Sequence, residues 1–153
     1  MTTRGIQDLN QKGIAHELVK YDHKEKGADF AARAVGFALA QTVKTLVVAL
    51  DGKHYVLVLM SGDRQVSMKK VAAACGAKRA AMADTATAER LTGYLVGGIS
   101  PFGIKRALPV VMDAAIAVYD KVMINAGSRG IMVKMAPADI VRTLGALVSD
   151  VAV

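Results

Sequence analysis

The sequence has little of what disulfide, metal or thiol chemistry requires. Cys75 is the only cysteine among 153 residues, so no disulfide can form within the chain and no cysteine-based metal site can be built. The three histidines, His16, His23 and His54, are scattered and match no metal-ligand spacing. Cys75 ends a predicted apolar helical stripe, which favours a core position over a catalytic one. We expect no bound metal.

Membrane and export signals are also lacking. No apolar run reaches the roughly 18 residues that a membrane-spanning helix needs. The longest uncharged stretch, residues 91–104, is broken by glycine and proline. The opening residues, MTTRGIQDLNQKG, contain no apolar signal segment. We expect a cytoplasmic protein that makes no use of a membrane.

Acidic residues are in deficit. Thirteen Asp and Glu oppose twenty Lys and Arg, giving a net charge of +7 and a pI near 9.7. This balance favours an anionic partner such as nucleic acid, although many basic proteins bind none. Hydrophobic residues make up 53% and charged residues 22%, which is typical of a globular chain. The length fits one domain over residues 1–153.

Cap and turn residues divide the chain into short helices and strands. Thr2 or Thr3, Ser67 and Asp84 are predicted helix caps, and Asp51-Gly52-Lys53 predicts a hairpin between two β-rich runs. A tight turn is predicted over NAGSRG, residues 125–130. Helices are predicted near residues 3–12, 28–37, 67–75, 84–92 and from Pro137, with Ile140, Val141, Leu144 and Leu147 on the last apolar face. Strands are predicted over 14–21, 44–50, 54–60, 107–113, 117–124 and 130–135.

This order mixes hairpins with intervening helices. It predicts an α+β fold, a single compact domain with a mixed, mainly antiparallel curved sheet and flanking helices. No coiled-coil pattern demands a dimer, so a monomer is expected.

The stretch TGYLVGGISPFGIKRALPV, residues 92–110, has the strongest functional signal. Four glycines and one proline fall within residues 93–103, which we call the glycine loop. Gly98 and Gly103 have the spacing of a phosphate loop, but Ile104 occupies the lysine position, and neither a dinucleotide-binding pattern nor a G-x-S-x-G elbow is present. Two interpretations stay open: a tight turn, or a backbone that binds a ligand or stabilises an oxyanion.

The loop, together with VKTLVVAL (43–50), MKKVAAACGAK (68–78) and NAGSRG, resembles the YbaK family. These are freestanding aminoacyl-tRNA deacylases related to the editing domain of bacterial prolyl-tRNA synthetases. The similarity runs in order over nearly the whole chain. It implies a hydrolase that removes a wrong amino acid, most often Cys or another small residue, from tRNA(Pro). It implies no cofactor, a substrate bound by its acceptor end, and prolyl-tRNA synthetase as a second partner.

The resemblance also assigns roles to residues. The family's key lysine falls on Lys44 and its loop glycine on Gly97, which would form the reaction centre. In cysteine-specific members the substrate's own thiol attacks the ester, so the protein supplies positioning. The residues expected to bind substrate are Tyr21, Phe30, Thr45, Gly98, Ile99, Ser100, Pro101, Asn125 and Met132.

Two of these positions depart from the cysteine-specific pattern. Asn125 stands where that type has a serine, and Met132 where it has an aspartate. The departures bear on which amino acid is removed more than on the reaction class. They also keep open a noncatalytic tRNA- or synthetase-binding module, and a hydrolase of another small ester or thioester is a second alternative.

Several side chains have two interpretations from sequence. Ser100 could bond the substrate's amino group or cap its own turn, and Tyr94 and Phe102 could line the site or pack in the core. Basic residues could together form a phosphate-facing surface. This set is Lys69, Lys70, Lys78, Arg79, Lys105, Arg106 and Arg129.

Overall fold

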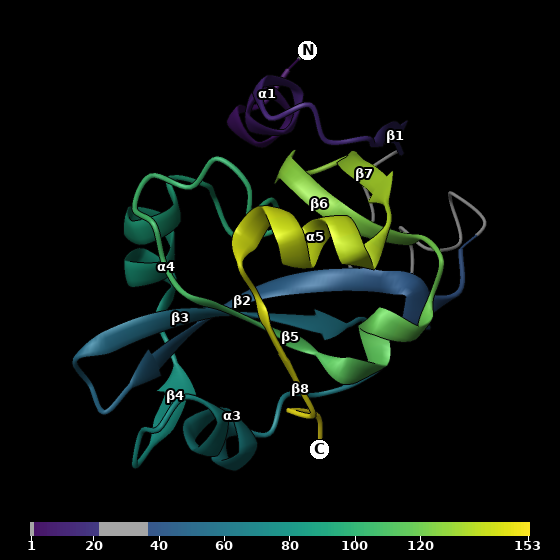
Figure 1. Cartoon of the computed structure of the whole chain (residues 1–153). Helices are drawn as coiled ribbons and strands as arrows, with labels where there is room; N and C mark the ends of the chain where they lie inside the picture. Colours follow the sequence, from purple (N-terminus) through teal and green to yellow (C-terminus); the bar gives the residue numbers. More distant parts are fainter. Residues whose placement is uncertain (1, 22–36) are drawn as a thin grey trace.

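The structure is a computed structural model that describes residues 2–21 and 37–153. One curved sheet has the strand order β1-β7-β6-β2-β3-β5-β8, and β4 pairs with the end of β2 on the same edge as β6 (Figure 1). In chain order the elements are α1 (Arg4–Gln11), β1 (Glu17–Lys20), η1 (Leu39–Gln41), β2 (Thr42–Leu50), β3 (His54–Ser61), α3 (Met68–Ala74), β4 (Ala80–Met82), α4 (Thr85–Thr92), β5 (Val110–Asp113), η2 (Ala114–Val118), β6 (Val122–Ser128), β7 (Ile131–Met135), α5 (Pro137–Leu144) and β8 (Leu147–Ser149).

The sheet is mixed, as predicted. The pairs β1–β7, β6–β7, β2–β3 and β2–β4 are antiparallel. The pairs β2–β6, β3–β5 and β5–β8 are parallel. On the edge of β2 away from β3, β6 pairs with the first residues of β2 and β4 pairs with the last ones. Between these two stretches, the middle of β2 has no strand partner on that edge among the described residues.

The two faces of the sheet have different cover. The larger core lies on the face of Val43 and Ile124, where α1, α4 and α5 pack. On the opposite face, α3 covers the part around Val48 and Met60, and Met123 and Met132 form a separate small cluster. The register puts Lys44 and Asn125 on the same face as Met123 and Met132.

The local signals for helix ends are confirmed. The side chains of Thr3, Ser67 and Asp84 accept hydrogen bonds from the first-turn N–H groups of α1, α3 and α4. Gly93 ends α4 in the left-handed region with φ 81°, which a residue with a Cβ adopts only with strain. The glycine loop therefore leaves α4 at a defined angle.

Three details differ from the prediction, and a fourth prediction is not tested. Residues 117–118 belong to η2 instead of a strand. The stretch NAGS belongs to β6, which bulges between Asn125 and Ser128, so the turn is shorter than predicted. Leu147 opens strand β8 because Gly145 ends α5 at φ 62°. The predicted helix over 28–37 lies almost entirely outside the described residues.

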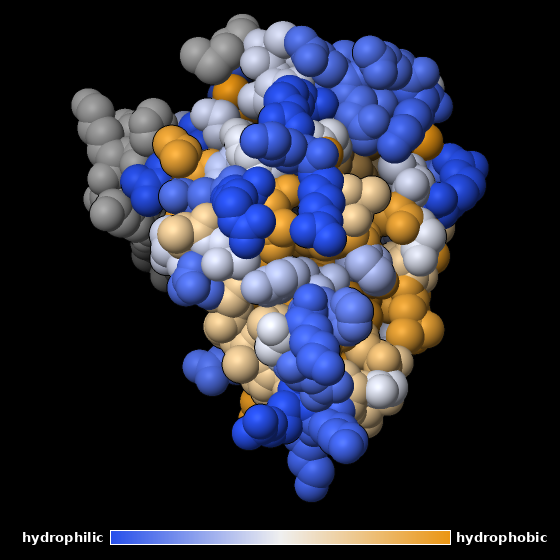
Figure 2. All heavy atoms as spheres, turned by 90° about the vertical axis from the view of Figure 1, so that its left-hand side faces the viewer, coloured by the Kyte–Doolittle hydropathy of each residue, from blue (hydrophilic) through white to orange (hydrophobic). Residues whose placement is uncertain are grey.

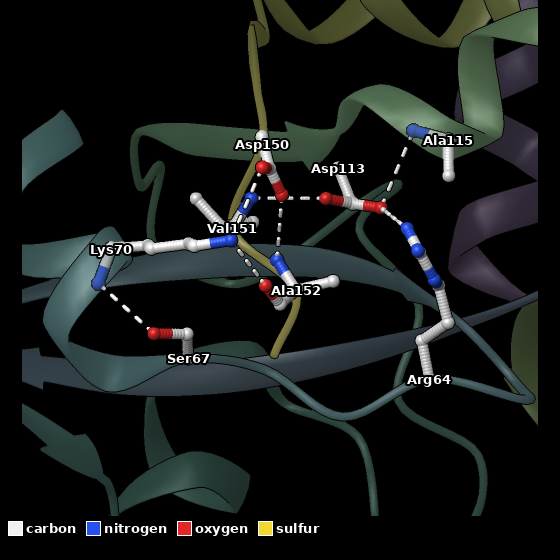
Figure 3. Close-up of polar contacts among 8 residues, drawn as sticks. All are labelled: Arg64, Ser67, Lys70, Asp113, Ala115, Asp150, Val151 and Ala152. Carbon is white, nitrogen blue, oxygen red and sulfur yellow. Dashed lines mark hydrogen bonds and ion pairs between the residues drawn. The ribbon is translucent and has the colours of Figure 1, made fainter.

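The C-terminal segment is tied to the sheet by a buried carboxylate (Figure 3). Asp113 is fully buried; one of its oxygens accepts from the N–H of Val151 at 3.0 Å, and the other lies 3.5 Å from Arg64. Lys70 reaches from α3 to the carbonyl of Ala152 at 2.8 Å. These contacts hold the end of the chain against α3, away from β6.

Candidate active site

Three of the predicted site residues lie in one row across the sheet. Asn125 of β6 is paired with Met132 of β7, and Val43 of β2 is paired with Ile124, so Lys44 takes the next position beside Asn125. Directly opposed side chains in a sheet have Cβ atoms about 4.5–5.5 Å apart. Strand pairing thus brings these residues to one place on one face, which we call the site face.

The glycine loop reaches this row from the side. In Figure 1 the segment after α4 lies between α4 and the far end of β6. A Cβ on Gly98 would lie 3.0 Å from the Cα of Ser128, and one on Gly127 would lie 2.7 Å from the Tyr94 ring. The loop and the bulged end of β6 therefore pack backbone to backbone, which only glycine allows at this separation.

Asn125 ties the loop to the row. Its Nδ2 donates to the carbonyl of Gly97 at 3.2 Å, and its Oδ1 accepts from the N–H of Gly127 at 2.9 Å. Gly97 has φ 96°, and its N–H has no hydrogen-bond partner among the described residues. The N–H of Gly98, in contrast, donates to the carbonyl of Leu95. Of the two glycine N–H groups, Gly97's is the one free to meet a substrate oxygen.

The other predicted site residues of the loop are buried in the core or pack against it. Ser100 is fully buried and its Oγ accepts from the N–H of Phe102, so it caps its own turn. Pro101 is buried, and Ile99 packs against the large core. Tyr94 is buried and donates to the carbonyl of Phe102, which settles Tyr94 and Phe102 as core residues. The structure does not bring Ile99, Ser100 or Pro101 onto the site face.

Thr45 is separated from its neighbour Lys44. Successive side chains of a strand point to opposite faces, and Thr45 pairs with Leu59 of the large core. Its hydroxyl is buried and has no hydrogen-bond partner among the described residues. The side chain of Thr45 therefore lies on the face of the sheet opposite to the side chains of Lys44 and Asn125.

Apolar residues form the wall beside the row. Met123 and Met132 are buried, and Tyr21 and Phe37 pack against them. The N–H of Tyr21 donates to the carbonyl of Gly130 at 3.0 Å, which holds Tyr21 next to the β6–β7 turn. Tyr21 is thus near the row, as the resemblance implies, whereas Phe30 lies outside the described residues.

A cavity of about 530 Å³ lies at another part of the sheet. His54, Cys75, Arg106, Leu108 and Gly145 are among its lining residues, and no member of the Lys44–Asn125–Met132 row lines it. Burial raises the pKa of the Cys75 thiol, which leaves less of the reactive thiolate at neutral pH. Since no residue of the row or the glycine loop borders this cavity, we keep the candidate site at the row.

Arg129 is a functional candidate that the sequence pattern did not single out. It sits in the β6–β7 turn and is exposed. A Cβ on Gly97 would lie 2.2 Å from the Nε of Arg129, so the guanidinium lies against the Cα of Gly97. The bulge in β6 brings the two together, and a bulge has no strong sequence signal.

The described residues give two further findings. Within residues 2–21 and 37–153, no helix is both long and apolar enough to span a bilayer. In the same part of the chain, no three His, Cys, Asp or Glu side chains gather as a metal-ligand set.

The chain is similar in sequence and in fold to known proteins. A family model described as the aminoacyl-tRNA editing domain matches residues 24–143. A protein of Enterococcus faecalis assigned as the Cys-tRNA(Pro)/Cys-tRNA(Cys) deacylase EbsC is 31% identical over 137 residues, which cover 88% of this chain and 84% of that protein. The multifunctional Ser/Thr-tRNA deacylase ProXp-y of Escherichia coli K12 is 30% identical over 143 residues, 91% of this chain and 85% of that protein. A solved structure assigned as a trans-editing enzyme for prolyl-tRNA synthetase matches with a TM-score of 0.91 at 27% identity, covering 98% of this chain and 95% of that one.

Proposed function

The chain belongs to the aminoacyl-tRNA editing domain family and is an aminoacyl-tRNA deacylase, and we propose that it removes a small noncognate residue, Cys first, from tRNA(Pro). Lys44 and the backbone of Gly97 form the reaction centre in this proposal. The observation that carries it is the row across β2, β6 and β7, in which Asn125 stands beside Lys44 and holds the carbonyl of Gly97.

The proposed reaction needs orientation and charge stabilisation more than a protein nucleophile. Water, or with Cys the substrate's own thiol as the resemblance implies, attacks the ester carbonyl carbon, the bond from that carbon to the ribose oxygen breaks, and the proton of the attacking group ends on the ribose oxygen. The N–H of Gly97 and the Lys44 ammonium are placed to stabilise the negative charge that develops on the ester oxygens. One such donor typically contributes about 10²–10³ in kcat.

The apolar wall supports a substrate without a hydroxyl. Met132 is 5% exposed and Met123 is 1% exposed. The Asn125 amide already serves Gly97 and Gly127, and the proposal assigns the Lys44 ammonium to the ester oxygens, so among the described residues the row holds no polar side chain without an assigned partner. Burying a hydroxyl without a partner costs about 1–3 kcal/mol, which favours Cys or Ala over Ser.

The charge of the protein suits the tRNA backbone. The net charge of +7 supports the sequence-independent part of tRNA affinity. Figure 2 shows a band of hydrophilic residues over the face that carries α4 and the β2–β3 hairpin, with apolar residues on either side. Docking on prolyl-tRNA synthetase and action as a monomer belong to the same proposal.

Deacylation of tRNA(Pro) charged with Cys, Ala, Ser or Pro tests the proposal. We expect rapid loss of Cys or Ala, slower loss of Ser, and Pro-tRNA(Pro) that outlives the assay. Stoichiometric tRNA binding without turnover would instead identify a binding module. Hydrolysis of free aminoacyl esters without competition from tRNA would identify a small-ester hydrolase.

A further inference from the structure

Arg129 and Gly97 form a contact that the proposed reaction has not used. The Cζ and Nη2 atoms of Arg129 would each lie 2.9 Å from a Cβ on Gly97, with Nε at 2.2 Å. The guanidinium group therefore rests on the side of Gly97 where any other residue would carry its side chain. A cation stands directly beside the backbone to which we assign the ester oxygen.

Backbone packing fixes the position of this cation. Gly98 approaches both neighbours in the turn: its Cβ would lie 3.0 Å from the Cα of Ser128 and 3.2 Å from the backbone nitrogen of Arg129. Gly130 completes the turn at φ 82°. Arg129 thus begins from a backbone that is in contact with the glycine loop, and its place relative to Gly97 is not left to a long flexible segment.

The charge of Arg129 is available. The side chain is exposed, and within the described residues no carboxylate lies within ion-pair distance of it. Other surface cations are engaged: Arg142 with Asp139 at 2.8 Å and Lys70 with Asp150 at 3.1 Å. An exposed guanidinium without a carboxylate partner in residues 2–21 and 37–153, next to a site for a nucleic-acid ester, can bind an anionic group of the substrate.

We propose that Arg129 binds the 5′-phosphate of the 3′-terminal nucleotide of the aminoacyl-tRNA. This inference rests on the proposed function, because it takes the ester to lie at Gly97. The scissile ester is attached to the terminal ribose, and the nearest phosphate lies at the other end of that ribose. A guanidinium can bind two phosphate oxygens at once, which fixes orientation as well as adding affinity.

The role has a distinctive consequence for substrate choice. Esters with the terminal phosphate should be strongly preferred to esters of the bare nucleoside, and this preference should depend on Arg129. Hydrogen bonds to charged groups contribute about 1.5–3 kcal/mol, which corresponds to about 10- to 150-fold. Lysine at this position supplies a point charge without the bidentate geometry, so part of the preference should remain.

The test measures kcat and KM of wild type, Arg129→Ala and Arg129→Lys on three esters of the preferred amino acid: tRNA(Pro), 5′-AMP and adenosine. Arg129→Ala should lower kcat/KM on tRNA and 5′-AMP esters by about 10- to 150-fold, mainly through KM, and leave the adenosine ester within about twofold. Arg142→Ala is the matched control, because Arg142 is an exposed arginine on α5, which covers the opposite face of the sheet. It should change none of the three.

Two results would overturn the inference while the proposed function stands. An equal loss on all three esters would mean that Arg129 only supports the loop, and no loss on any would mean that it is merely solvated. If wild type hydrolyses none of the esters, the proposed function itself fails. Binding of an uncharged CCA-ended RNA hairpin then decides: Arg129→Ala must weaken it about tenfold and lower the salt slope by about one, and unchanged binding overturns the inference.

Discussion

The side chain of Asn125 holds the carbonyl of Gly97 at 3.2 Å while it accepts the N–H of Gly127 at 2.9 Å. One amide thus joins the glycine loop to the bulge of β6, two segments that are 28 residues apart. The peptide that we assign to the reaction centre is therefore oriented from the neighbouring strand. The side chain at position 125, where the resemblance implied a serine, therefore has a structural role in orienting this peptide.

Asn125→Asp tests this tie. The carboxylate keeps the acceptor for Gly127 but replaces the donor to Gly97 with a negative charge that faces a carbonyl. A typical intramolecular hydrogen bond contributes about 0.5–1.5 kcal/mol, so we expect kcat to fall at least about 3- to 10-fold with KM little changed. Asn125→Ser is the comparison variant, because it shortens the side chain without adding a charge. Single-turnover deacylation that is as fast in Asn125→Asp as in wild type would contradict the role of the Asn125–Gly97 hydrogen bond.

Gly98→Ala tests the packing of the loop on β6. A Cβ at this position meets backbone atoms of Ser128 and Arg129, which cannot move aside as a side-chain end could. We expect the loop to shift and deacylation to fall more than tenfold, because misplacement of about 1 Å can cost about 10²-fold.

Gly76→Ala provides the comparison for Gly98→Ala. Gly76 lies at φ 68° with no atom within 4 Å of a Cβ, so alanine there strains the backbone without touching the loop. This variant should lose stability, by about 1–2 kcal/mol, and keep its activity at 25 °C. Equal activity losses in the two variants would argue against a special role for the loop packing.

Asp113→Ala should destabilise the fold without altering the reaction. Its carboxylate is fully buried and accepts from the N–H groups of Val151 and Ala115 while it faces Arg64. Hydrogen bonds to a charged group contribute about 1.5–3 kcal/mol each. The free energy of unfolding, measured in urea, should therefore fall by at least that amount. Lys70→Ala, which removes an exposed ion pair with Asp150 and one part-buried hydrogen bond to the carbonyl of Ala152, should lower the free energy of unfolding less.

Asp51 should contribute an acid-sensitive part of the stability. The N–H groups of Arg79 and Lys78 hold the pKa of the Asp51 carboxyl below its usual value of 3.8. A depressed pKa in the folded state gives stability that is present above the unfolded pKa and is lost as the pH falls through the folded one. Wild type should exceed Asp51→Asn in Tm at pH 6, and the difference should shrink below about pH 4. A difference that is constant with pH would contradict this.

Local signals in the sequence were sufficient for much of the fold. Thr3, Ser67 and Asp84 cap helices, and Asp51-Gly52 turns a hairpin, because each acts on backbone groups within a few residues. The three-residue strands β4 and β8 could not be predicted, since their pairing is decided by distant partners. The sequence predicts a turn where β6 has its bulge, because the pairing of β6 with β7 also depends on the partner strand.

The site was predictable only in part. Motif resemblance pointed to Lys44, Gly97, Asn125 and Met132, and strand pairing places Lys44, Asn125 and Met132 in one row. It also pointed to Thr45, whose side chain lies on the other face. Arg129 stood among seven basic candidates with nothing to distinguish it. Its contact with Gly97 arises from a bulge and a loop 32 residues apart, which no local pattern encodes.

The most direct measurement is single-turnover deacylation of Cys-tRNA(Pro) by Lys44→Met. Methionine keeps most of the apolar stem on the site face and removes the ammonium, so the fold should keep its Tm. The account predicts a loss of about 10²-fold or more in the rate of ester cleavage, the size expected for removing one group that stabilises the developing oxyanion. A Lys44→Met enzyme that cleaves the ester within about threefold of the wild-type rate would contradict the placement of Lys44 at the reaction centre.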